Sequence, residues 1–374
     1  MPEVLIVGAF GQQNPGDEAL LDAGLALVGR LPGWEPIVVS ADPAGTTART
    51  GARSVTNHPA AVGREVARLD GLVVAGGTVF KELHPLSARR PGSLLRRGVA
   101  LARAVRARGK PVVAVGVGAA PTRAAAQGRV RHLAAAADLL VLRDDASARI
   151  LVGSGVPGPL RVGADLAWDV VPDLPGLRPA PERPGELVVA VSALAGGAEL
   201  ARLLVRRLEP LCLAGWEVVL EPWQGPPRLG PDARLAHDVA RRLAGRVRVG
   251  SAPEDLAAAV HAARERRVVV AMRFHAALAA AAAGTPFVAV AHEPKLAALA
   301  ERFGQPVVTP TSPPDHLAAA VALAVEGPGP DPATAARERQ RAAAMVDLAR
   351  LVLAGRGEPD GLEHLALVPD PVTV

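Results

Sequence analysis

The stretch Arg267–Gly284, RVVVAMRFHAALAAAAAG, decides the fold of this chain. Its apolar run Val268–Ala271 is typical of a buried parallel strand, and the alanines and leucine of Ala276–Ala283 favour a helix. Arg273 and His275 lie between the two, at a helix end with a positive dipole and free N–H groups. This arrangement suits a small anion with a phosphate and a carboxylate, although a surface arginine and a capping histidine fit it equally well.

Composition places the chain among globular proteins with room for about two domains. Of its 374 residues, 49% are hydrophobic and 21% are charged, which is ample apolar material for a core. No apolar run reaches the roughly 20 residues of a membrane-spanning helix. The N-terminal MPEVLIVGAF lacks the basic start of a signal peptide. We therefore expect a cytoplasmic protein that begins with a β-strand.

Charge and cysteine content argue against several classes of partner and site. The 42 basic residues include only three lysines, Lys81, Lys110 and Lys295, so 39 are arginines, as a GC-rich coding sequence would produce. No basic segment is interleaved with aromatic residues, so we expect no nucleic-acid partner. Cys212 is the only cysteine, which rules out an intramolecular disulfide and a multi-cysteine zinc site.

The loop after the first predicted strand, Val4–Val7, is polar but is not a phosphate-binding loop. Gly11 and Gly16 have the spacing of a Walker A motif, yet Asp17 and Glu18 stand where lysine and serine or threonine are required. Two carboxylates would repel a nucleotide phosphate. We interpret the loop as a site for hydroxyl groups, or as a tight turn in which Asp17 caps a helix that starts near Glu18.

Two further strands of the first half end in residues suited to a ligand. Leu72–Ala75 ends in Gly76 and Gly77, where the backbone can approach a ligand closely or simply turn. Leu139–Leu142 is followed by Arg143, a cation at the strand end where open α/β sheets bind ligands. The two aspartates after Arg143 fit a metal pair, but we expect a helix cap and a first-turn acid.

Strands alternate with helices in both halves, which predicts parallel sheets. The Pro-rich segment Asp173–Gly185 is the predicted linker. We therefore expect an α/β protein with two Rossmann-like parallel-sheet domains facing a cleft, at residues 1–175 and 186–330. A last helix, within residues 331–356, is long enough to cross back to the first domain, and we expect the tail from Glu358 to be loosely held.

The second half has two more candidate positions at strand ends. Trp223 and Gln224 follow one strand, where the tryptophan fits the core better than a ligand site. His292, Glu293 and Lys295 follow another strand and could contact a bound anion. A structural salt bridge is the alternative for the charged residues there.

The chain resembles the polysaccharide pyruvyl transferase family over roughly residues 4–308, through several motifs in the family's order. They are Asn14-Pro-Gly16-Asp17-Glu18-Ala, Gly76-Gly77, Val141-Leu-Arg143-Asp144-Asp-Ala-Ser147, Gly163-Ala-Asp165, Met272-Arg273-Phe-His275-Ala and His292-Glu-Pro294-Lys295. Two positions depart from the family pattern. Ala75 replaces a third glycine, and Val191-Ser192-Ala193-Leu194 lacks the arginine of a Ser-Trp-Arg motif.

The resemblance implies a fold like that of the two-domain, GT-B-like glycosyltransferases. It also implies phosphoenolpyruvate as donor and, as product, a pyruvate ketal on a sugar of a cell-wall or extracellular polysaccharide or of its lipid-linked precursor. The first domain would be the acceptor side and the second the donor side. The family's Arg-x-His motif, which contacts phosphoenolpyruvate, corresponds to Arg273 and His275. Contact with the inner face of the membrane is expected only through a lipid-linked acceptor.

The chemistry of this reaction gives each candidate residue a role. Arginine matches both anionic groups of phosphoenolpyruvate, so Arg273 and Arg143 are the main candidates for donor binding. Glu293 and Lys295 are further donor-binding candidates. His275 is the best general acid, or binds phosphate only. Asp17 or Glu18 is the predicted base for the sugar hydroxyl. The remaining acceptor-binding candidates are Asn14, Gly76, Gly77 and Gln224, with Asp17 again. This chemistry requires no metal and no cofactor.

Two other functions fit the same sequence. A nucleotide-sugar glycosyltransferase has the same architecture and would bind a sugar nucleotide in place of phosphoenolpyruvate. A non-catalytic sugar- or anion-binding relative would bind phosphoenolpyruvate without releasing phosphate. The missing arginine near Val191 is compatible with this second alternative.

Overall fold

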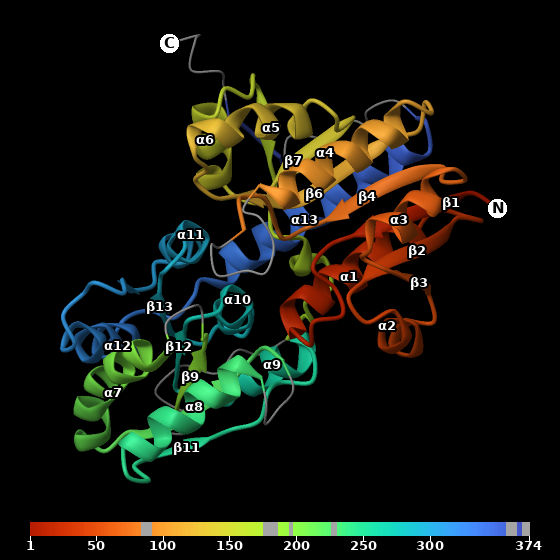
Figure 1. The fold of residues 1–374 in the computed structure, drawn as a ribbon. Helices are drawn as coiled ribbons and strands as arrows, with labels where there is room; N and C mark the ends of the chain where they lie inside the picture. The colour runs from red at the N-terminus through yellow and green to blue at the C-terminus, as the bar shows by residue number, and fades with distance from the viewer. Residues whose placement is uncertain (84–91, 175–185, 194–196, 226–229, 357–364, 369–374) are drawn as a thin grey trace. The chain divides into compact units, whose positions relative to one another are not determined.

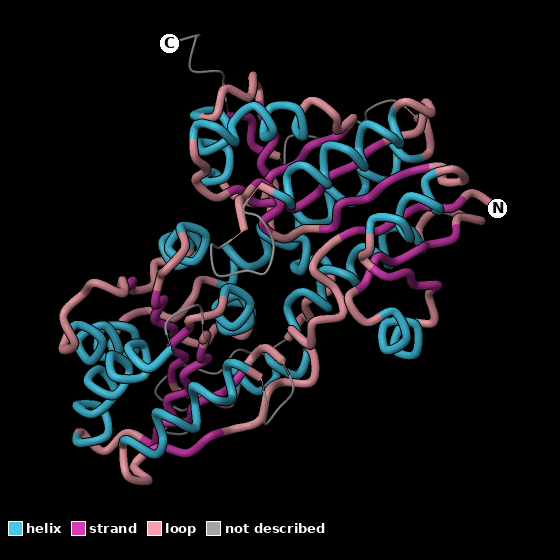
Figure 2. Tube along the Cα trace, viewed as in Figure 1, coloured by secondary structure: helices cyan, strands magenta, loops and turns pink. Residues whose placement is uncertain are grey.

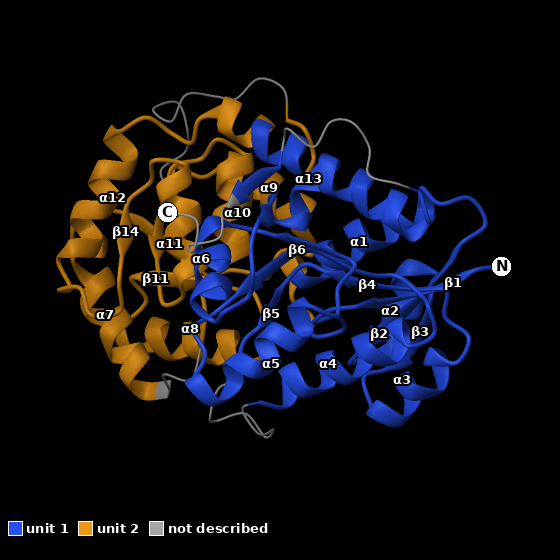
Figure 3. Cartoon of the chain, turned by 90° about the horizontal axis from the view of Figure 1, so that it is seen from above, with its two compact units in different colours: residues 1–12, 17–170, 337–374 blue, residues 13–16, 171–336 orange. Residues whose placement is uncertain are grey.

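The computed structural model describes residues 1–83, 92–174, 186–193, 197–225, 230–356 and 365–368. The predicted linker Asp173–Gly185 therefore lies outside the described residues apart from Asp173 and Leu174. The chain divides into two compact units, shown in different colours in Figure 3. Unit 1 comprises residues 1–12, 17–170 and 337–374, and unit 2 comprises residues 13–16 and 171–336. The short segment 13–16 is thus part of unit 2 despite its place near the N-terminus.

Unit 1 is built on a sheet that has nine strands within its described residues. The strand order is β15-β8-β7-β6-β4-β1-β2-β3, with β5 paired to β6. Every pairing is parallel except that of β15 with β8. The strands are β1 (Glu3–Val7), β2 (Glu35–Ser40), β3 (Arg53–Thr56), β4 (Gly71–Ala75), β5 (Thr78–Phe80), β6 (Val112–Ala119), β7 (Leu139–Leu142), β8 (Leu160–Val162) and β15 (Ala366–Val368).

Helices cover both faces of this sheet (Figures 1 and 2). Right-handed crossovers place α3 to α6 on one face and α1 and α2 on the other, and α4 contacts both α3 and α5. The helices are α1 (Pro15–Gly29), α2 (Pro43–Thr50), α3 (Pro59–Val66), α4 (Ser93–Arg106), α5 (Ala124–Ala134), α6 (Asp145–Gly153), the short 3₁₀ helix η1 (Leu166–Asp169) and α13 (Pro332–Leu353). Residues of α13 pack onto unit 1, where Met345 and Leu353 lie close to Gly163 and Gly71.

Unit 2 has an all-parallel sheet of six strands in its described part, in the order β11-β10-β9-β12-β13-β14. The chain winds outward from β9 through β10 to β11 and then crosses to β12 on the other side. The gap between the carboxyl ends of β9 and β12 is therefore the topological switch point, where open α/β sheets bind ligands. The strands are β9 (Glu186–Val191), β10 (Glu217–Pro222), β11 (Val247–Val249), β12 (Val268–Ala271), β13 (Phe287–Val290) and β14 (Val307–Val308).

The two faces of the unit 2 sheet are also covered by helices. Contacts join α7 to α8 on one face, and α10 to α9 and α11 on the other. The apolar β-branched strands are almost fully buried, as expected between two helical layers. The helices are α7 (Gly197–Leu213), α8 (Pro231–Arg242), α9 (Leu256–Arg264), α10 (Phe274–Ala282), α11 (Pro294–Arg302) and α12 (His316–Glu326).

Several elements differ from their predicted bounds. Helix α1 starts at Pro15 rather than near Glu18, because proline is suited to the first helical turn and the Asn14 side chain accepts a hydrogen bond from the Gly16 N–H (3.0 Å). Asp17 is therefore a first-turn acid and not the N-cap. Helix α10 starts at Phe274, which places His275 inside its first turn. The tail was expected to be loosely held, but β15 adds an antiparallel strand there.

No helix in the described part of the chain is long and apolar enough to cross a membrane.

Candidate functional site

The switch point of unit 2 is organised by a carboxylate that the sequence analysis missed. Asp232, in the first turn of α8, is 0% exposed and accepts hydrogen bonds from the backbone N–H groups of Ala193 (2.8 Å) and Trp223 (3.3 Å). These two N–H groups follow β9 and β10. Asp232 thereby joins the ends of two strands. Asp232 was missed in the sequence analysis because an acid after Gly-Pro is common in the first turn of a helix, where it complements the helix dipole.

The same carboxylate binds Arg273, which follows β12. Arg273 donates from Nη2 to both Asp232 oxygens (2.8 and 2.6 Å) and from Nε to Oδ2 (3.2 Å). Among the residues that the structure describes, Nη1 of Arg273 makes no hydrogen bond, and 17% of the side chain is exposed. The guanidinium is therefore fixed on one edge and offers its other edge to a ligand.

His275 is the second residue of α10 and contacts both backbone and an aromatic ring. A methyl group added to Gly16 would lie 1.9 Å from its Nδ1, so the Gly16 backbone packs directly against the imidazole. The Phe274 ring meets the imidazole edge-on at 5.3 Å between centroids. Lys295 Nζ lies 6.0 Å from the centroid of the Phe274 ring. Unit 2 thus brings His275 and Lys295 close to the same aromatic side chain.

The strand end after β13 adds a second imidazole and an ion pair. Lys295 Nζ and Glu293 Oε2 are 2.7 Å apart, which matches the structural salt bridge considered for this pair. Burial lowers the pKa of His292, and the nearby charges of Lys295 and Arg273 act in the same direction. Glu293 and a hydrogen bond to the Val290 backbone oppose this shift. Burial therefore favours the neutral form of the His292 imidazole.

The 13–16 segment contacts the rest of unit 2 at Gly225, the residue after Gln224. The Gly225 N–H donates to the Gln13 carbonyl (3.2 Å), and Trp223 on the other side of Gln224 is buried, as predicted. The Asn14 side chain accepts from Gly16, so it shapes the turn that brings Gly16 to His275. Asn14 and Gln224, two of the predicted acceptor-binding residues, thus belong to the same part of unit 2.

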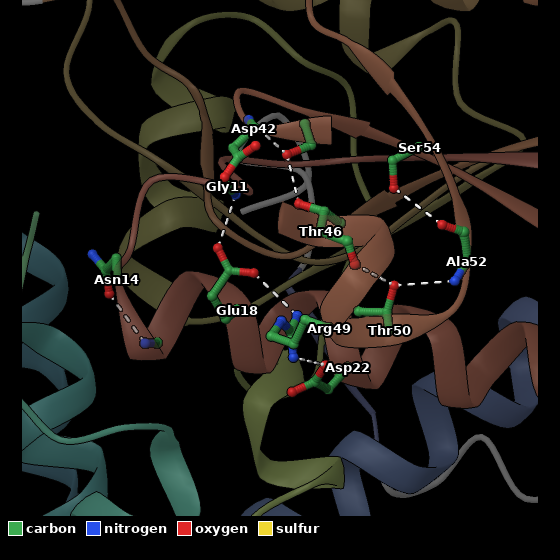
Figure 4. A network of polar contacts seen from close by, with 12 residues as sticks. Gly11, Asn14, Glu18, Asp22, Asp42, Thr46, Arg49, Thr50, Ala52 and Ser54 are labelled. Carbon is green, nitrogen blue, oxygen red and sulfur yellow. Dashed lines mark hydrogen bonds and ion pairs between the residues drawn. The ribbon is translucent and has the colours of Figure 1, made fainter. Parts of the chain in front are cut away.

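The remaining predicted site residues belong to unit 1, and Glu18 is the most constrained of them (Figure 4). Its Oε1 accepts from the Gly11 N–H (2.8 Å) and its Oε2 from Arg49 Nη2 (3.0 Å). Arg49 also binds Asp22 (2.7 Å). With both oxygens engaged, Glu18 closes the β1–α1 loop onto α2. Asp17 follows Gly16 in the sequence, and Gly16 is the residue that packs against His275.

Gly76 and Gly77 form the turn between β4 and β5. Both have left-handed backbone angles, with φ of 63° and 74°, which residues with a side chain rarely adopt. A methyl group on Gly76 would also lie 2.6 Å from Leu20. The backbone angles and the contact with Leu20 explain why the turn requires glycine.

Arg143 is buried in a cluster of its own in unit 1. It donates from Nε to Asp144 (2.9 Å) and from Nη1 to Asp165 (3.5 Å), and its side chain is 4% exposed. Burial opposes its charge, but the two carboxylates outweigh that effect and raise the pKa of Arg143. Asp144 also accepts from the Ser147 N–H (2.7 Å), which confirms it as a helix cap. Arg143 and Arg273 belong to different units.

A small pocket with about 20 Å³ of free space lies behind the switch point, between the sheet of unit 2 and its helices α9 and α10. Glu221 and Trp223 line it, and the Trp223 indole N–H donates to Glu221 (2.9 Å). Burial raises the pKa of Glu221 to about 7, against the opposing effects of this hydrogen bond and of Arg248. The sequence carried no signal for this group, because a glutamate in a strand pattern fits a solvent-facing position.

Comparison with known structures finds the same fold at low sequence identity. The S. aureus MnaA–UDP structure matches with a TM-score of 0.61 and 12% identity, over 96% of this chain and 99% of that one. A putative UDP-N-acetylglucosamine 2-epimerase from Listeria monocytogenes matches with a TM-score of 0.60 and 12% identity, over 96% and 98%. A glycosyltransferase from Rickettsia africae matches with a TM-score of 0.56 and 10% identity, over 95% and 96%. The predicted GT-B-like α/β fold class is thereby confirmed.

Comparison with curated protein sequences gives no significant match. In the described part of the chain, no group of three or more His, Cys, Asp or Glu side chains is placed to bind a metal ion. The family model for polysaccharide pyruvyl transferase matches residues 14–294, about three quarters of the chain and most of the span over which the motifs were found. This match confirms the resemblance inferred from those motifs, and the chain belongs to the polysaccharide pyruvyl transferase family, a family of transferases.

Proposed function

We propose that this protein transfers the enolpyruvyl group of phosphoenolpyruvate to a sugar of a cell-wall or extracellular polysaccharide, or of its lipid-linked precursor, and forms a pyruvate ketal. The observation that carries the proposal is the arrangement of Arg273 and His275 at the N-terminus of α10. The guanidinium there is positioned by Asp232, and the imidazole is packed against Gly16. A fixed cation, an imidazole and a helix N-terminus together suit a small dianion.

Each group has a role in donor binding. The open edge of Arg273 binds the carboxylate or the phosphate, and the N–H groups of the first turn of α10 add further donors. Lys295 supplies a second positive charge, held by Glu293 and close to the Phe274 ring. Arg143 stays in the proposed donor set through the family motif, although two carboxylates offset its charge.

The reaction balances without any oxidant or reductant. His275 protonates the methylene carbon of phosphoenolpyruvate, which leaves an oxocarbenium-like centre at C2. One sugar hydroxyl adds to C2 and gives up its proton to a base, for which we propose Asp17. The C2–O bond to phosphate then breaks, and a second hydroxyl of the same sugar closes the ketal. One hydroxyl proton replaces the proton given by His275, and the other leaves with the phosphate.

Phosphate release with phosphoenolpyruvate and a panel of β-linked amino-sugar acceptors tests the proposal. Turnover should require both substrates, and the product mass should rise by pyruvate less water. His275→Ala should slow turnover by about 10²- to 10⁴-fold, the usual range for a general acid, and Arg273→Ala should raise the KM for phosphoenolpyruvate. The surface variants Arg242→Ala and His261→Ala in the same unit are controls and should keep wild-type rates.

Two outcomes would replace this function with another. The S. aureus structure contains UDP, so a shift of the melting temperature by UDP-sugars and none by phosphoenolpyruvate would favour a nucleotide-sugar glycosyltransferase. Binding of phosphoenolpyruvate without phosphate release from any acceptor would favour a non-catalytic relative.

A further inference from the structure

The positive charge of the chain is concentrated in one segment. Residues 83–137 contain eleven arginines and lysines and no aspartate or glutamate. The chain as a whole has 42 basic and 37 acidic residues, so the rest of it has 31 and 37 and is net negative. A uniform excess of arginine from coding bias would not produce this separation. The segment therefore calls for a specific explanation.

The fold gathers the arginines of α4 and α5 on one face of unit 1. Helices α4 and α5 are in contact and cover the same side of the sheet (Figures 1 and 3). Neither helix contains an acidic residue. Gly98 of α4 packs close to Leu133 of α5, and the guanidinium of Arg129 reaches the start of α4 at Gly92. The apolar sides of the two helices are buried, so their arginines point to solvent together.

Only some of these charges have an acidic partner. Asp138 binds Arg106 (3.3 Å), Asp70 binds Lys110 (2.7 Å) and Glu82 binds Arg123 (2.8 Å). Among the described residues of segment 83–137, six exposed arginines form no ion pair with a carboxylate. We call them the basic face: Arg96, Arg97, Arg103, Arg108, Arg129 and Arg131.

We propose that the basic face docks this protein on a membrane surface rich in anionic phospholipid. Arginines spread over two helices suit a planar array of phosphates, and each adds about fivefold to binding at such a surface. Residues 83–137 contain no phenylalanine, tryptophan or tyrosine on which nucleic-acid bases could stack. The exposed positions between the arginines, such as Ala100 and Ala104, are too small to insert into the acyl layer. The contact is therefore electrostatic and reversible.

Co-sedimentation with phospholipid vesicles tests this inference on the full chain. The wild type should bind vesicles of phosphatidylcholine with 30% phosphatidylglycerol at 50 mM salt, but not vesicles of pure phosphatidylcholine. Binding should fall steeply by 500 mM salt, because salt screens an electrostatic contact. The fourfold variant Arg96→Gln, Arg97→Gln, Arg103→Gln, Arg129→Gln should lose at least on the order of 100-fold in vesicle affinity.

A second fourfold variant provides the matched control. Arg202→Gln, Arg206→Gln, Arg234→Gln and Arg241→Gln remove the same charge from exposed positions of unit 2 and should leave binding within about twofold of wild type. Equal loss in both variants would overturn the inference, as would equal binding to neutral vesicles. Tighter binding of duplex DNA or RNA than of anionic vesicles at the same salt would assign the basic face to nucleic acid instead. Soluble-substrate phosphate release should be unchanged in both variants, so a failed vesicle assay does not bear on the proposed transfer reaction.

Discussion

Gly16 lies directly against the imidazole of His275, although the two residues are 259 positions apart in the sequence. Both belong to unit 2, because the 13–16 segment joins it through the hydrogen bond from Gly225 to Gln13. Glycine is required here by space and not by backbone angle, since a Cβ would overlap Nδ1. The Gly16 backbone, at the N-terminus of α1, therefore restricts the position of the imidazole ring.

Gly16→Ala should therefore damage catalysis more than folding. The added methyl must push the imidazole aside, and a shift of about 1 Å in a catalytic group costs on the order of 10²-fold in rate. Gly29→Ala in the same helix is the matched control, because nothing lies within 4 Å of the added Cβ. That change should be neutral or stabilise by up to about 1 kcal/mol. Wild-type turnover by Gly16→Ala would contradict a catalytic position for His275.

Asp232→Asn should destabilise unit 2 and weaken donor binding together. The substitution leaves the buried side of Arg273 without its counter-charge, and breaking a buried pair in this way costs about 3–5 kcal/mol. Urea denaturation and the KM for phosphoenolpyruvate are the measurements. Asp238→Asn on the same helix removes a carboxylate that binds Arg241 and Arg242 at the surface, and should cost under about 1 kcal/mol. Equal effects of the two substitutions would show that Asp232 does not position Arg273.

Glu221 should make stability fall as pH rises from about 5 to 7. The pKa of its carboxyl is raised to about 7 in the folded protein, above the usual 4.5, so the folded state binds more protons in that interval. By linkage, the stabilisation is fully present below pH 4.5 and is lost as pH rises through 7, by at most about 3 kcal/mol. Glu221→Gln should flatten this part of the profile, measured by urea denaturation at several pH values. An unchanged slope in the variant would show that another group is responsible.

His292 should contribute with the opposite sign. Burial lowers the pKa of its imidazole below the usual 6.5, so the folded state binds fewer protons than the unfolded state just below that pH. Stability should therefore fall as pH drops below about 6.5. NMR titration of the histidine ring signals, with His292→Gln for assignment, should show one imidazole that protonates below its usual pH. Protonation of His292 at or above pH 6.5 would disprove the shift.

Much of the architecture follows from local patterns. Strands β12 and β7 were predicted with their observed bounds, because short apolar runs between loop residues have few alternatives. Helix α13 lies within residues 331–356, where the last helix was predicted. The elements from residue 43 to 66 were missed, since α2 and α3 are short helices of weak pattern. The antiparallel strand β15 was missed because its pairing with β8 joins residues about 200 positions apart.

The sequence by itself determined the α/β class, the family and the placement of Arg273 and His275 at a strand-to-helix junction, because these depend on residue order and local periodicity. Tertiary structure alone decided that Asp232 binds Arg273, that Gly16 packs against His275 and that Glu221 is buried. It also decided that both Glu18 oxygens are engaged by Gly11 and Arg49. Most of these contacts join groups that are far apart in the sequence. Hydrogen bonding, steric exclusion and burial at such contacts depend on distances that no spacing along the chain encodes.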